Sequence, residues 1–372
     1  MKKIAYCIRK GYLEGGDGVQ AVKTKEYIER DYPDVKIDIL DDVSMLNGDY
    51  QLVHIFNYAT PELTTDYFEK AIQLGLKIVS SPVYWDYSFS SIPFPLIKSF
   101  KKESISERYA QFHKRLNKFF ANIPLPQFKK AYFYVSNKFS RQIKYFIEHS
   151  ELILPNSQEE GDLCCEFAKC EESKNKIRVV YNGVDVSGVK IMAEDAFFEK
   201  YKLPKNYVLQ VGRMEYLKNP LNLLAALMDD KDIPLVFLGN MKCSPLYLEQ
   251  LKKMADKRGN VYFVSNVPHD EVYSFYRYAS VHVLLSMRES PGLVSLEALS
   301  QGCPIVISDK RFLPVDTYFS EQYESVNPYD LKAIREAVVK SINKDHYSVD
   351  LSRFSWAEVA RQTYEAYKEV LQ

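Results

Sequence analysis

The sequence predicts an α/β protein made of two doubly wound domains that face a central cleft. Short apolar segments alternate with amphipathic helical segments along most of the chain, which is typical of parallel sheets covered by helices. This alternation is interrupted over residues 182–201 and then restarts, which indicates a second domain of the same kind. Glycine and polar residues gather directly after several expected strands, where open parallel sheets bind their ligands.

Length and composition agree with this fold class. The 372 residues are enough for two domains with separate cores. With 46% hydrophobic and 26% charged residues, a disordered chain is excluded. No run approaches eighteen apolar residues and a strand begins near the first residue, so we expect a cytoplasmic protein without a spanning helix or a secretory signal. The six cysteines form no Cys-x-x-Cys pair, so we expect neither disulfides nor structural zinc.

The first expected domain spans residues 1–188. Runs of apolar residues predict its strands, and apolar residues three and four apart predict its helices. The strands are expected at residues 3–8, 35–39, 52–55, 77–79, 152–154 and 177–180, and the helices at residues 19–30, 62–74 and 159–170.

The second expected domain spans residues 189–353. Asn182 and Gly183 form a turn signal at the boundary. Strands are expected at residues 207–211, 235–238, 261–264, 281–285 and 304–307, with helices at residues 221–228, 246–258 and 270–278 and another between Gly292 and Gly302. Residues 354–372 form a separate amphipathic helix, which we expect to cross back onto the first domain.

A basic, aromatic insertion is expected within the first domain, over about residues 96–146. It begins at Leu96, ends at Phe146, and holds twelve Lys or Arg, two Glu and twelve aromatic residues, so its net charge is +10 in a neutral chain. Residues 108–120 can place Phe112, Leu116 and Phe119 on one helical face. Such a helix is a candidate for binding an anionic membrane surface. The alternative is that the aromatics pack on the domain and the lysines are solvated. No RNA- or DNA-binding motif accompanies the charge, so nucleic acid is not an expected partner.

Candidate binding residues lie on loops after strands of both domains. Gly15 and Gly16 follow the first strand and let backbone approach an anion. Arg213 and Lys218 follow the first strand of the second domain. The loop from Glu289 opens a helix whose first amides suit a phosphate. Because the carboxyl ends of the strands face one cleft, these loops are expected to converge there.

Glu289 and Glu297 are candidate ligand contacts around this helix. Glu297 shares an apolar-leaning face with Leu293 and Leu296, and a carboxylate placed there needs hydrogen-bond donors. The vicinal hydroxyls of a ribose would supply them, and Glu289 lies where a sugar could follow. The alternative is that Glu297 meets a neighbouring Arg or Lys and that Glu289 is a solvated loop residue.

Two segments resemble the signature of the family 4 retaining glycosyltransferases, which have the GT-B fold of two Rossmann-like domains. They are Val-Gly-Arg-Met-Glu-Tyr-Leu-Lys-Asn-Pro at residues 211–220 and the Glu-x7-Glu spacing from Glu289 to Glu297. Residues 154–157, 181–185 and 354–356 also resemble family landmarks. The resemblance covers essentially the whole chain and is strongest over residues 208–308. It implies transfer of a hexose from a UDP- or GDP-type sugar to an acceptor hydroxyl with retention of configuration, without a metal or other cofactor.

The resemblance also implies a role for each candidate residue. Arg213 and Lys218 hold the donor diphosphate, Glu289 contacts the donor sugar, and these three are the expected catalytic residues. Glu297 binds the ribose hydroxyls. The other expected donor contacts are Gly15 and Gly16 at the diphosphate, the backbone near Val267 at the base, and the amides of Gly292, Leu293 and Val294 at the sugar or phosphate. No metal ligands are expected, because Asp230 and Asp232 precede a strand rather than follow one.

The chain departs from the family pattern at two places. Many relatives carry a histidine after the fourth strand, whereas this chain has Tyr84, Trp85 and Asp86, which either contact the sugar or pack the insertion. Glu-Ser-Pro-Gly at residues 289–292 replaces the commoner Glu-Gly-Phe-Gly, which leaves the donor sugar open. The basic insertion in the acceptor domain suggests, by family analogy, a lipid-linked saccharide acceptor for a cell-surface polysaccharide, with the protein peripheral at the inner face of the membrane.

Three alternatives stay open. Residues 16–21 fit the dinucleotide fingerprint G-x-G-x-x-A, which would indicate a dehydrogenase. A nucleotide-sugar epimerase would keep the fold but change the reaction. A non-catalytic protein that binds a sugar nucleotide or serves as a membrane scaffold would show binding without turnover.

Overall fold

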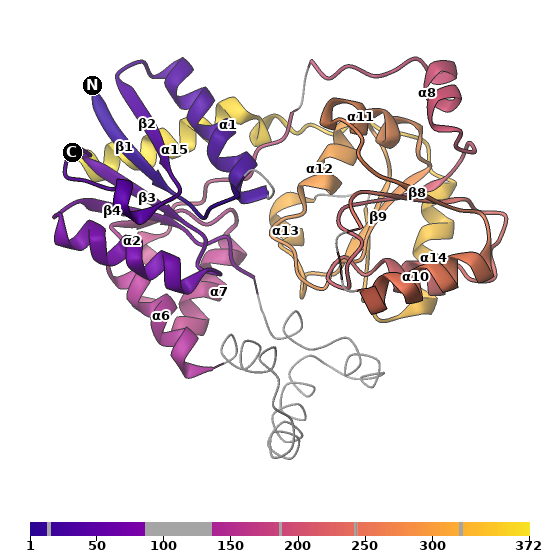
Figure 1. Ribbon diagram of the computed structural model, residues 1–372, viewed down its shortest axis with the longest axis horizontal. Helices are drawn as coiled ribbons and strands as arrows, with labels where there is room; N and C mark the ends of the chain where they lie inside the picture. The colour runs from indigo at the N-terminus through magenta and orange to yellow at the C-terminus, as the bar shows by residue number, and fades with distance from the viewer. Residues whose placement is uncertain (13–15, 86–135, 186–187, 242, 244, 320–322) are drawn as a thin grey trace, which may run out of the picture.

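The computed structural model describes residues 1–12, 16–85, 136–185, 188–241, 243, 245–319 and 323–372 (Figure 1). Our expectations for Gly15, for Asp86 and for residues 96–135 lie outside these ranges. The described chain forms two parallel sheets, each covered by helices on both faces.

The first sheet has the strand order β2-β1-β3-β4-β5, and every pairing is parallel. Its strands are β1 (Lys2–Cys7), β2 (Val35–Leu40), β3 (Leu52–Phe56), β4 (Lys77–Ser81) and β5 (Leu152–Ile153). Its helices are α1 (Gly16–Asp31), α2 (Pro61–Gln73), α6 (Asn137–Glu148), α7 (Gln158–Ala168) and α15 (Trp356–Leu371), with short 3-10 turns η2 (Val43–Met45) and η3 (Glu171–Lys176).

Alternation along β1 divides the core into two layers. Ile4 and Tyr6 point to the face covered by α1 and α15, whereas Ala5 and Cys7 point to the face covered by α2, α6 and α7 (Figure 1). Side chains of a strand alternate between the two faces of its sheet, so the apolar run at residues 4–7 of β1 is buried on both faces.

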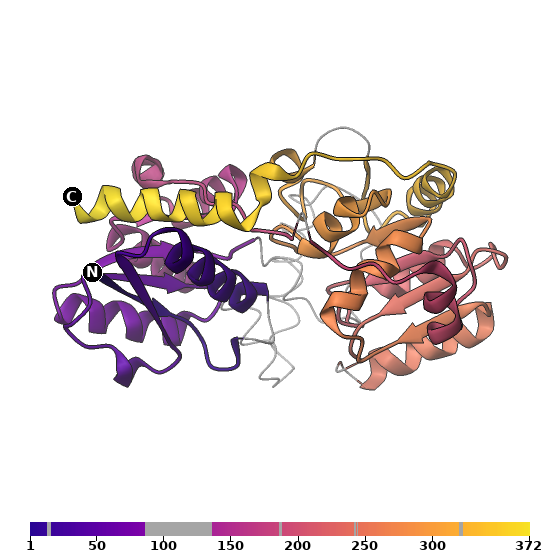
Figure 2. The same cartoon turned by 90° about the horizontal axis from the view of Figure 1, so that it is seen from above.

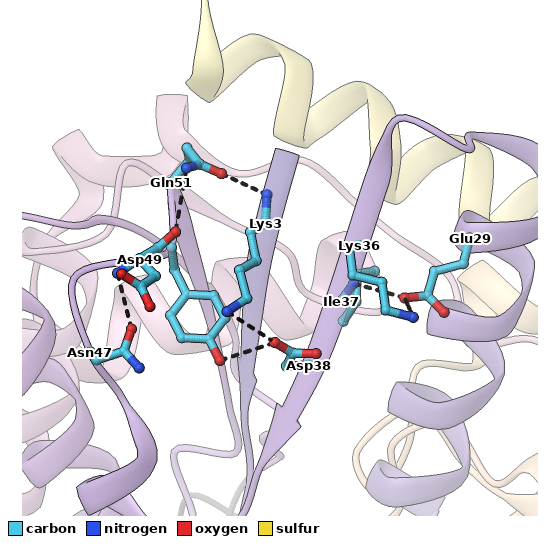
Figure 3. Close-up of polar contacts among 9 residues, drawn as sticks. Lys3, Glu29, Lys36, Ile37, Asp38, Asn47, Asp49 and Gln51 are labelled. Carbon is cyan, nitrogen blue, oxygen red and sulfur yellow. Dashed lines mark hydrogen bonds and ion pairs between the residues drawn. The ribbon is translucent and has the colours of Figure 1, made fainter. Parts of the chain in front are cut away.

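The outer end of this sheet is held by polar contacts (Figure 3). The amide of Ile37 donates to Glu29 Oε1 of α1 (2.9 Å), and the Lys36 ammonium lies 3.1 Å from the same oxygen. On the other side of β1, the Lys3 amide donates to Gln51 Oε1 (2.6 Å). These contacts hold α1 and the segment that leads into β3 at the amino ends of the strands, which is the end of the sheet away from the cleft.

The second sheet has the strand order β11-β10-β9-β6-β7-β8 and is also parallel. Its strands are β6 (Val208–Val211), β7 (Leu235–Leu238), β8 (Val261–Val264), β9 (Val281–Leu284), β10 (Ile305–Ser308) and β11 (Tyr323–Val326). Its helices are α8 (Glu194–Tyr201), α9 (Pro220–Ala226), α10 (Pro245–Arg258), α11 (His269–Tyr278), α12 (Leu293–Ser300), α13 (Val315–Tyr318) and α14 (Leu331–Ile342). Leu235 and Phe237 pack toward α9, α10 and α14, whereas Val236 and Leu238 pack toward α11 and α12.

The last helix, α15, lies along the first domain beside α1 (Figure 2). Tyr364 stacks on Tyr32 with ring centroids 3.7 Å apart, and the Lys77 ammonium donates to the Val370 carbonyl (2.5 Å). The chain therefore passes between the domains twice. The two passages touch, because the Val184 amide donates to the carbonyl of Phe354 (2.9 Å), the last residue of the 3-10 turn η4 (Ser352–Phe354).

Two sequence expectations are corrected by the fold. Residues 177–180 form a single bridge to β5 rather than a strand, because Pro155 has no N–H with which to continue the ladder. The expected insertion reached Phe146, but Phe146 and Phe139 belong to α6 and are fully buried against the sheet. Phe146 stacks on Phe68 (4.9 Å), so it is a core residue and not a membrane contact.

A search of the described helices finds none that is long and apolar enough to cross a membrane. We assign residues 1–188 to the domain of the first sheet and residues 189–353 to the domain of the second sheet.

Candidate functional site

A cavity of about 560 Å³ lies between the two domains, at the carboxyl ends of their strands. Both domains contribute to its walls, and the loops after β1, β3, β6, β7 and β9 all reach it. Among the described residues, four basic and four acidic side chains line it: Arg9, Arg213, Lys218 and Arg288, with Asp17, Glu160, Glu215 and Glu289. The cavity is thus polar and charged, as a site for an ionic ligand must be.

The loop after β6 owes its course to glycines. Gly239, after β7, has a φ of +146°, and a Cβ there would lie 2.0 Å from the Gly212 carbonyl oxygen. Only glycine allows two neighbouring strand ends to approach so closely. The buried Gln210 amide also donates to the Lys218 carbonyl (2.7 Å). These contacts hold the backbone of Lys218 beside the cavity.

Lys218 and Glu289 are brought together in the cavity wall. The Lys218 ammonium donates to Glu289 Oε2, and both side chains are more than four-fifths buried. The Ser286 hydroxyl donates to the same oxygen (2.9 Å). Glu289 is therefore not a solvated loop residue. Its own amide donates to the Phe312 carbonyl (2.8 Å), which fixes the loop after β9.

Arg213 and the start of α12 complete this wall. Arg213 is more than half exposed and lies 2.9 Å from Glu215, so its guanidinium is the more accessible of the two predicted cations. Gly292, with a φ of +88°, precedes α12, and no side chain caps the helix. Gly292, Leu293 and Val294 all line the cavity. The positive end of the helix dipole therefore faces the same space as Arg213 and Lys218.

Glu297 and Val267 are not among the residues that line the cavity. Glu297 accepts a hydrogen bond from the Tyr276 hydroxyl (3.0 Å) and lies 3.6 Å from His269 Nε2. This contact with Glu297 raises the pKa of His269. The donors that the buried carboxylate requires are thus a tyrosine and a histidine, rather than the Arg or Lys of the alternative reading.

The first domain supplies the opposite wall. Gly16 begins α1, and a Cβ built on it would lie 3.8 Å from Leu293 Cδ1 of the other domain, so Gly16 faces the start of α12 across the cavity. Beside it, Asp17 accepts two hydrogen bonds from Arg9 (3.1 Å each) and one from Asn57 (3.2 Å). Gly15 lies outside the described residues.

Of the residues that follow β4, one packs in the core of the first domain and another lines the cavity. Tyr84 is buried against Phe139 and Phe167, so it packs the domain. Trp85 lines the cavity, and its indole N–H donates to the Arg311 carbonyl of the second domain (3.2 Å). His54 of β3 also lines the cavity, but its ring nitrogens bond Tyr367 (2.6 Å) and Ser81 (2.8 Å). Burial lowers the pKa of His54 to about 3, so it is neutral.

Sequence reasoning missed the residues at the floor of the cavity. Asn156 and Glu160 come from the first domain and Ser290 from the second, and they contact one another there. Asn156 lies in the family landmark at residues 154–157 and Ser290 in the altered loop at residues 289–292, but neither was given a role. Glu160 gave only the spacing Ser157-Gln-Glu-Glu160, which matches a helix capping box. Asp230 lies elsewhere, and its carboxylate pairs with Arg335 (2.6 Å).

Part of the chain is similar to known glycosyltransferases. Over residues 193–355, the chain matches the model of the family described as glycosyl transferases group 1. It is 29% identical over 184 residues to the O-antigen chain mannosyltransferase B of Escherichia coli, which covers 46% of this chain and 48% of that protein. The chain thus spans about half the length of this curated relative.

Solved structures match over nearly the whole chain. The structure of Anabaena HepE in complex with UDP and glucose superimposes with a TM-score of 0.70 at 12% identity, over 99% of this chain and 100% of that one. A glycosyltransferase from Rickettsia africae gives 0.69 at 15% identity, over 100% and 99% of the two chains. The chain has the GT-B fold. The cavity of this GT-B protein lies in the cleft that its two facing domains create.

Proposed function

We propose that this protein is a retaining glycosyltransferase that moves a hexose from a nucleoside diphosphate sugar to an acceptor hydroxyl. One observation carries the proposal: Lys218, Arg213 and the first turn of α12 face a single interdomain cavity that also holds Glu289. Fixed cations and helix-terminal amides are what a leaving diphosphate needs, because they stabilise the charge that develops on it.

The proposed chemistry uses this wall without a metal. The diphosphate competes with Glu289 for Lys218, since one ammonium faces both anions. Glu289 then contacts the sugar, while Arg213 neutralises the outer phosphate oxygens. Gly16 approaches the diphosphate from the opposite domain. Glu297, on α12, and the backbone near Val267, after β8, remain the proposed ribose and base contacts, although neither residue lines the cavity.

The proposed donor is of the UDP or GDP type, and the proposed acceptor is a lipid-linked saccharide of a cell-surface polysaccharide. The related Escherichia coli protein is named as an O-antigen chain mannosyltransferase, and a similar structure was solved with UDP and glucose, which supports a sugar nucleotide as donor. We place the protein in the cytoplasm, peripheral at the inner face of the membrane through the basic segment at residues 96–135.

Thermal-shift measurements with UDP, GDP and their sugars test the proposal, because a ligand that binds only the folded state raises its stability. We expect one nucleotide series to raise Tm and its sugar to be consumed when acceptor is supplied. No shift with either series would refute a sugar-nucleotide site. Acceptor-independent conversion of the donor would indicate an epimerase instead.

A further inference from the structure

Glu160 is a fully buried carboxylate at the floor of the cavity. Its Oε2 accepts from the Asn156 amide (2.6 Å), and its Oε1 accepts from the Tyr84 amide. Burial raises the pKa of Glu160 to about 7, although both amides oppose this shift. Within the described residues, no lysine or arginine forms an ion pair with it. A buried carboxylate without a cation is costly, so an ordinary packing role does not account for it.

A capping box does not account for it either. In that motif the glutamate would return to the amide of the N-cap residue, Ser157. Here Ser157 does cap α7, accepting from the Glu160 amide (3.0 Å). The Glu160 carboxylate instead turns away to Asn156, Tyr84 and the second domain. The same serine-to-glutamate spacing occurs at Ser355 and Glu358, where the glutamate pairs with exposed Arg361.

Ser290, in the second domain, contacts Asn156 and Glu160 from the other side of the cavity. Its hydroxyl accepts from Asn156 Nδ2 (2.5 Å) and lies 3.5 Å from Glu160 Oε1. Its carbonyl lies 3.5 Å from Asn182 Nδ2. Tyr318 of α13 also belongs to this hydrogen-bond network, because its hydroxyl donates to the Asn156 carbonyl (2.7 Å). The polar groups of the first domain thus hold the residue that directly follows Glu289.

We propose that Glu160 and Ser290 are a positioning pair for the transfer reaction, in which the buried carboxylate orders Asn156 and the serine hydroxyl, and these fix the Glu289 loop across the cleft. The inference rests on the proposed function and assigns neither residue to direct contact with the donor. The loop at residues 288–292 also carries Gly292, so its position sets both the Glu289 carboxylate and the start of α12. A small displacement of such groups lowers the rate more than it lowers ligand affinity.

The test uses the full chain with Ser290→Ala, Ser290→Thr and Glu160→Gln. Ser140→Ala is the control for loss of a hydroxyl, since Ser140 of α6 donates to the Phe167 carbonyl of α7 (2.6 Å). Glu358→Gln is the control for loss of a capping-box carboxylate. Three quantities are measured: the Kd for UDP and for GDP by calorimetry, kcat and KM for hydrolysis of UDP-glucose and GDP-mannose, and hydrogen exchange over residues 288–294.

We expect Ser290→Ala and Glu160→Gln to lower kcat by about tenfold while the nucleotide Kd stays within about twofold of wild type. Glutamine fails because its Nε2 cannot accept from a backbone amide. Ser290→Thr, which keeps the hydroxyl, should recover most of kcat. Exchange at residues 288–294 should be faster in Ser290→Ala than in Ser140→Ala, even if hydrolysis is too slow to measure.

Unchanged kcat and unchanged exchange in Ser290→Ala would refute the positioning pair while leaving the glycosyltransferase in place. Parallel losses of kcat, affinity and Tm, without recovery in Ser290→Thr, would show a structural role only and also refute it. A wild type that binds neither UDP nor GDP would refute the proposed function, and the pair with it.

Discussion

At the scale of single residues, three cations among the described residues of the cavity are paired within its own walls. Arg9 pairs with Asp17, Arg213 with Glu215, and Lys218 with Glu289. A ligand with two phosphates must therefore compete with a carboxylate for each of these three cations. These ion pairs favour a diphosphate over an anion with a single charge. Only a doubly charged ligand with several acceptor oxygens forms enough hydrogen bonds to offset the ion pairs that it breaks.

Lys218→Ala should weaken the binding of UDP or GDP by about 10- to 100-fold, since a partly buried, charge-assisted hydrogen bond is lost. Calorimetry measures the change in Kd. Lys253→Ala removes an exposed ion pair with Glu249 on α10 and should leave Kd unchanged. Equal affinity in Lys218→Ala and wild type would remove Lys218 from the site.

Glu160 gives a second prediction, on stability against pH. Because its folded pKa of about 7 exceeds its ordinary value of 4.5, the folded state holds the proton more tightly than the unfolded state. The contribution of Glu160 to stability is therefore complete below pH 4.5 and is lost as pH rises through 7. The loss amounts to about 3 kcal/mol.

Urea titrations of wild type and Glu160→Gln between pH 4.5 and 8 measure this term as a difference in pH slope. Neighbouring Cys164 and Tyr318 do not contribute, because burial raises the pKa of each well above this range. Parallel stability curves for the two proteins would contradict the prediction.

Sequence reasoning located the residues of this wall to differing degrees. Arg213, Lys218, Glu289 and the start of α12 were placed at one cavity because parallel strands end at a common edge. Glu160 was missed because its spacing from Ser157 has an ordinary explanation in helix capping. Its function depends on Ser290, which lies 130 residues away, and no local pattern reports so distant a contact.

At the scale of elements, the turn into α12 depends on one glycine. Gly292 has a φ of +88°, and a Cβ there would lie 2.9 Å from both Glu289 Cγ and Leu284 Cδ2. Gly259 also has a positive φ, +75°, but a Cβ there would meet nothing within 4 Å. Both glycines have a backbone conformation that strains other residues, but only at Gly292 would an added Cβ also clash with its neighbours.

Gly292→Ala should therefore destabilise the protein by about 1 to 3 kcal/mol more than Gly259→Ala. It should also weaken nucleotide binding, because Glu289 and the first α12 amides must move. Denaturant unfolding and calorimetry measure the two effects. Equal stability losses in both variants would mean that the loop yields to the extra carbon without strain.

The elements that sequence reasoning missed have different causes. It predicted the strands and helices next to the cleft, where apolar runs are long and loops are marked by glycine. It did not predict β11 (Tyr323–Val326), α6 (Asn137–Glu148), α8, α13 or α14. β11 is a half-exposed edge strand with a charged residue. α6 does carry apolar residues at helical spacing, such as Phe139, Ile143 and Phe146, but its Lys and Arg residues continue the basic segment before it, so the sequence predicted it as part of the insertion.

At the scale of the whole molecule, the first domain is completed by the end of the chain. α15 contributes Val359, Ala360, Tyr367 and Val370 to the core beneath β1 and α1. The Tyr367 hydroxyl bonds both His54 and Tyr6 (2.6 and 2.8 Å). The first domain therefore depends on a helix that follows the second domain in sequence.

Removing residues 354–372 should expose this face and speed hydrogen exchange in α1, β1 and β3, while β6, β7 and β9 keep their protection. Exchange measured by mass spectrometry on the full and shortened chains makes the comparison. Full protection of β1 in the shortened chain would show that α15 is dispensable for the first core.

The contact between Val184 and Phe354 has a consequence for how such a protein can be rebuilt. Val184 and Phe354, which flank residues 185–353, are joined by a hydrogen bond. The chain therefore leaves the first domain and returns to it at the same place, and residues 185–353 form a segment that could be exchanged as a unit. The corresponding segment of a relative could be grafted between these two positions, with the core of the first domain left as it is. The segment that matches the glycosyl transferases group 1 model, residues 193–355, overlaps nearly all of residues 185–353.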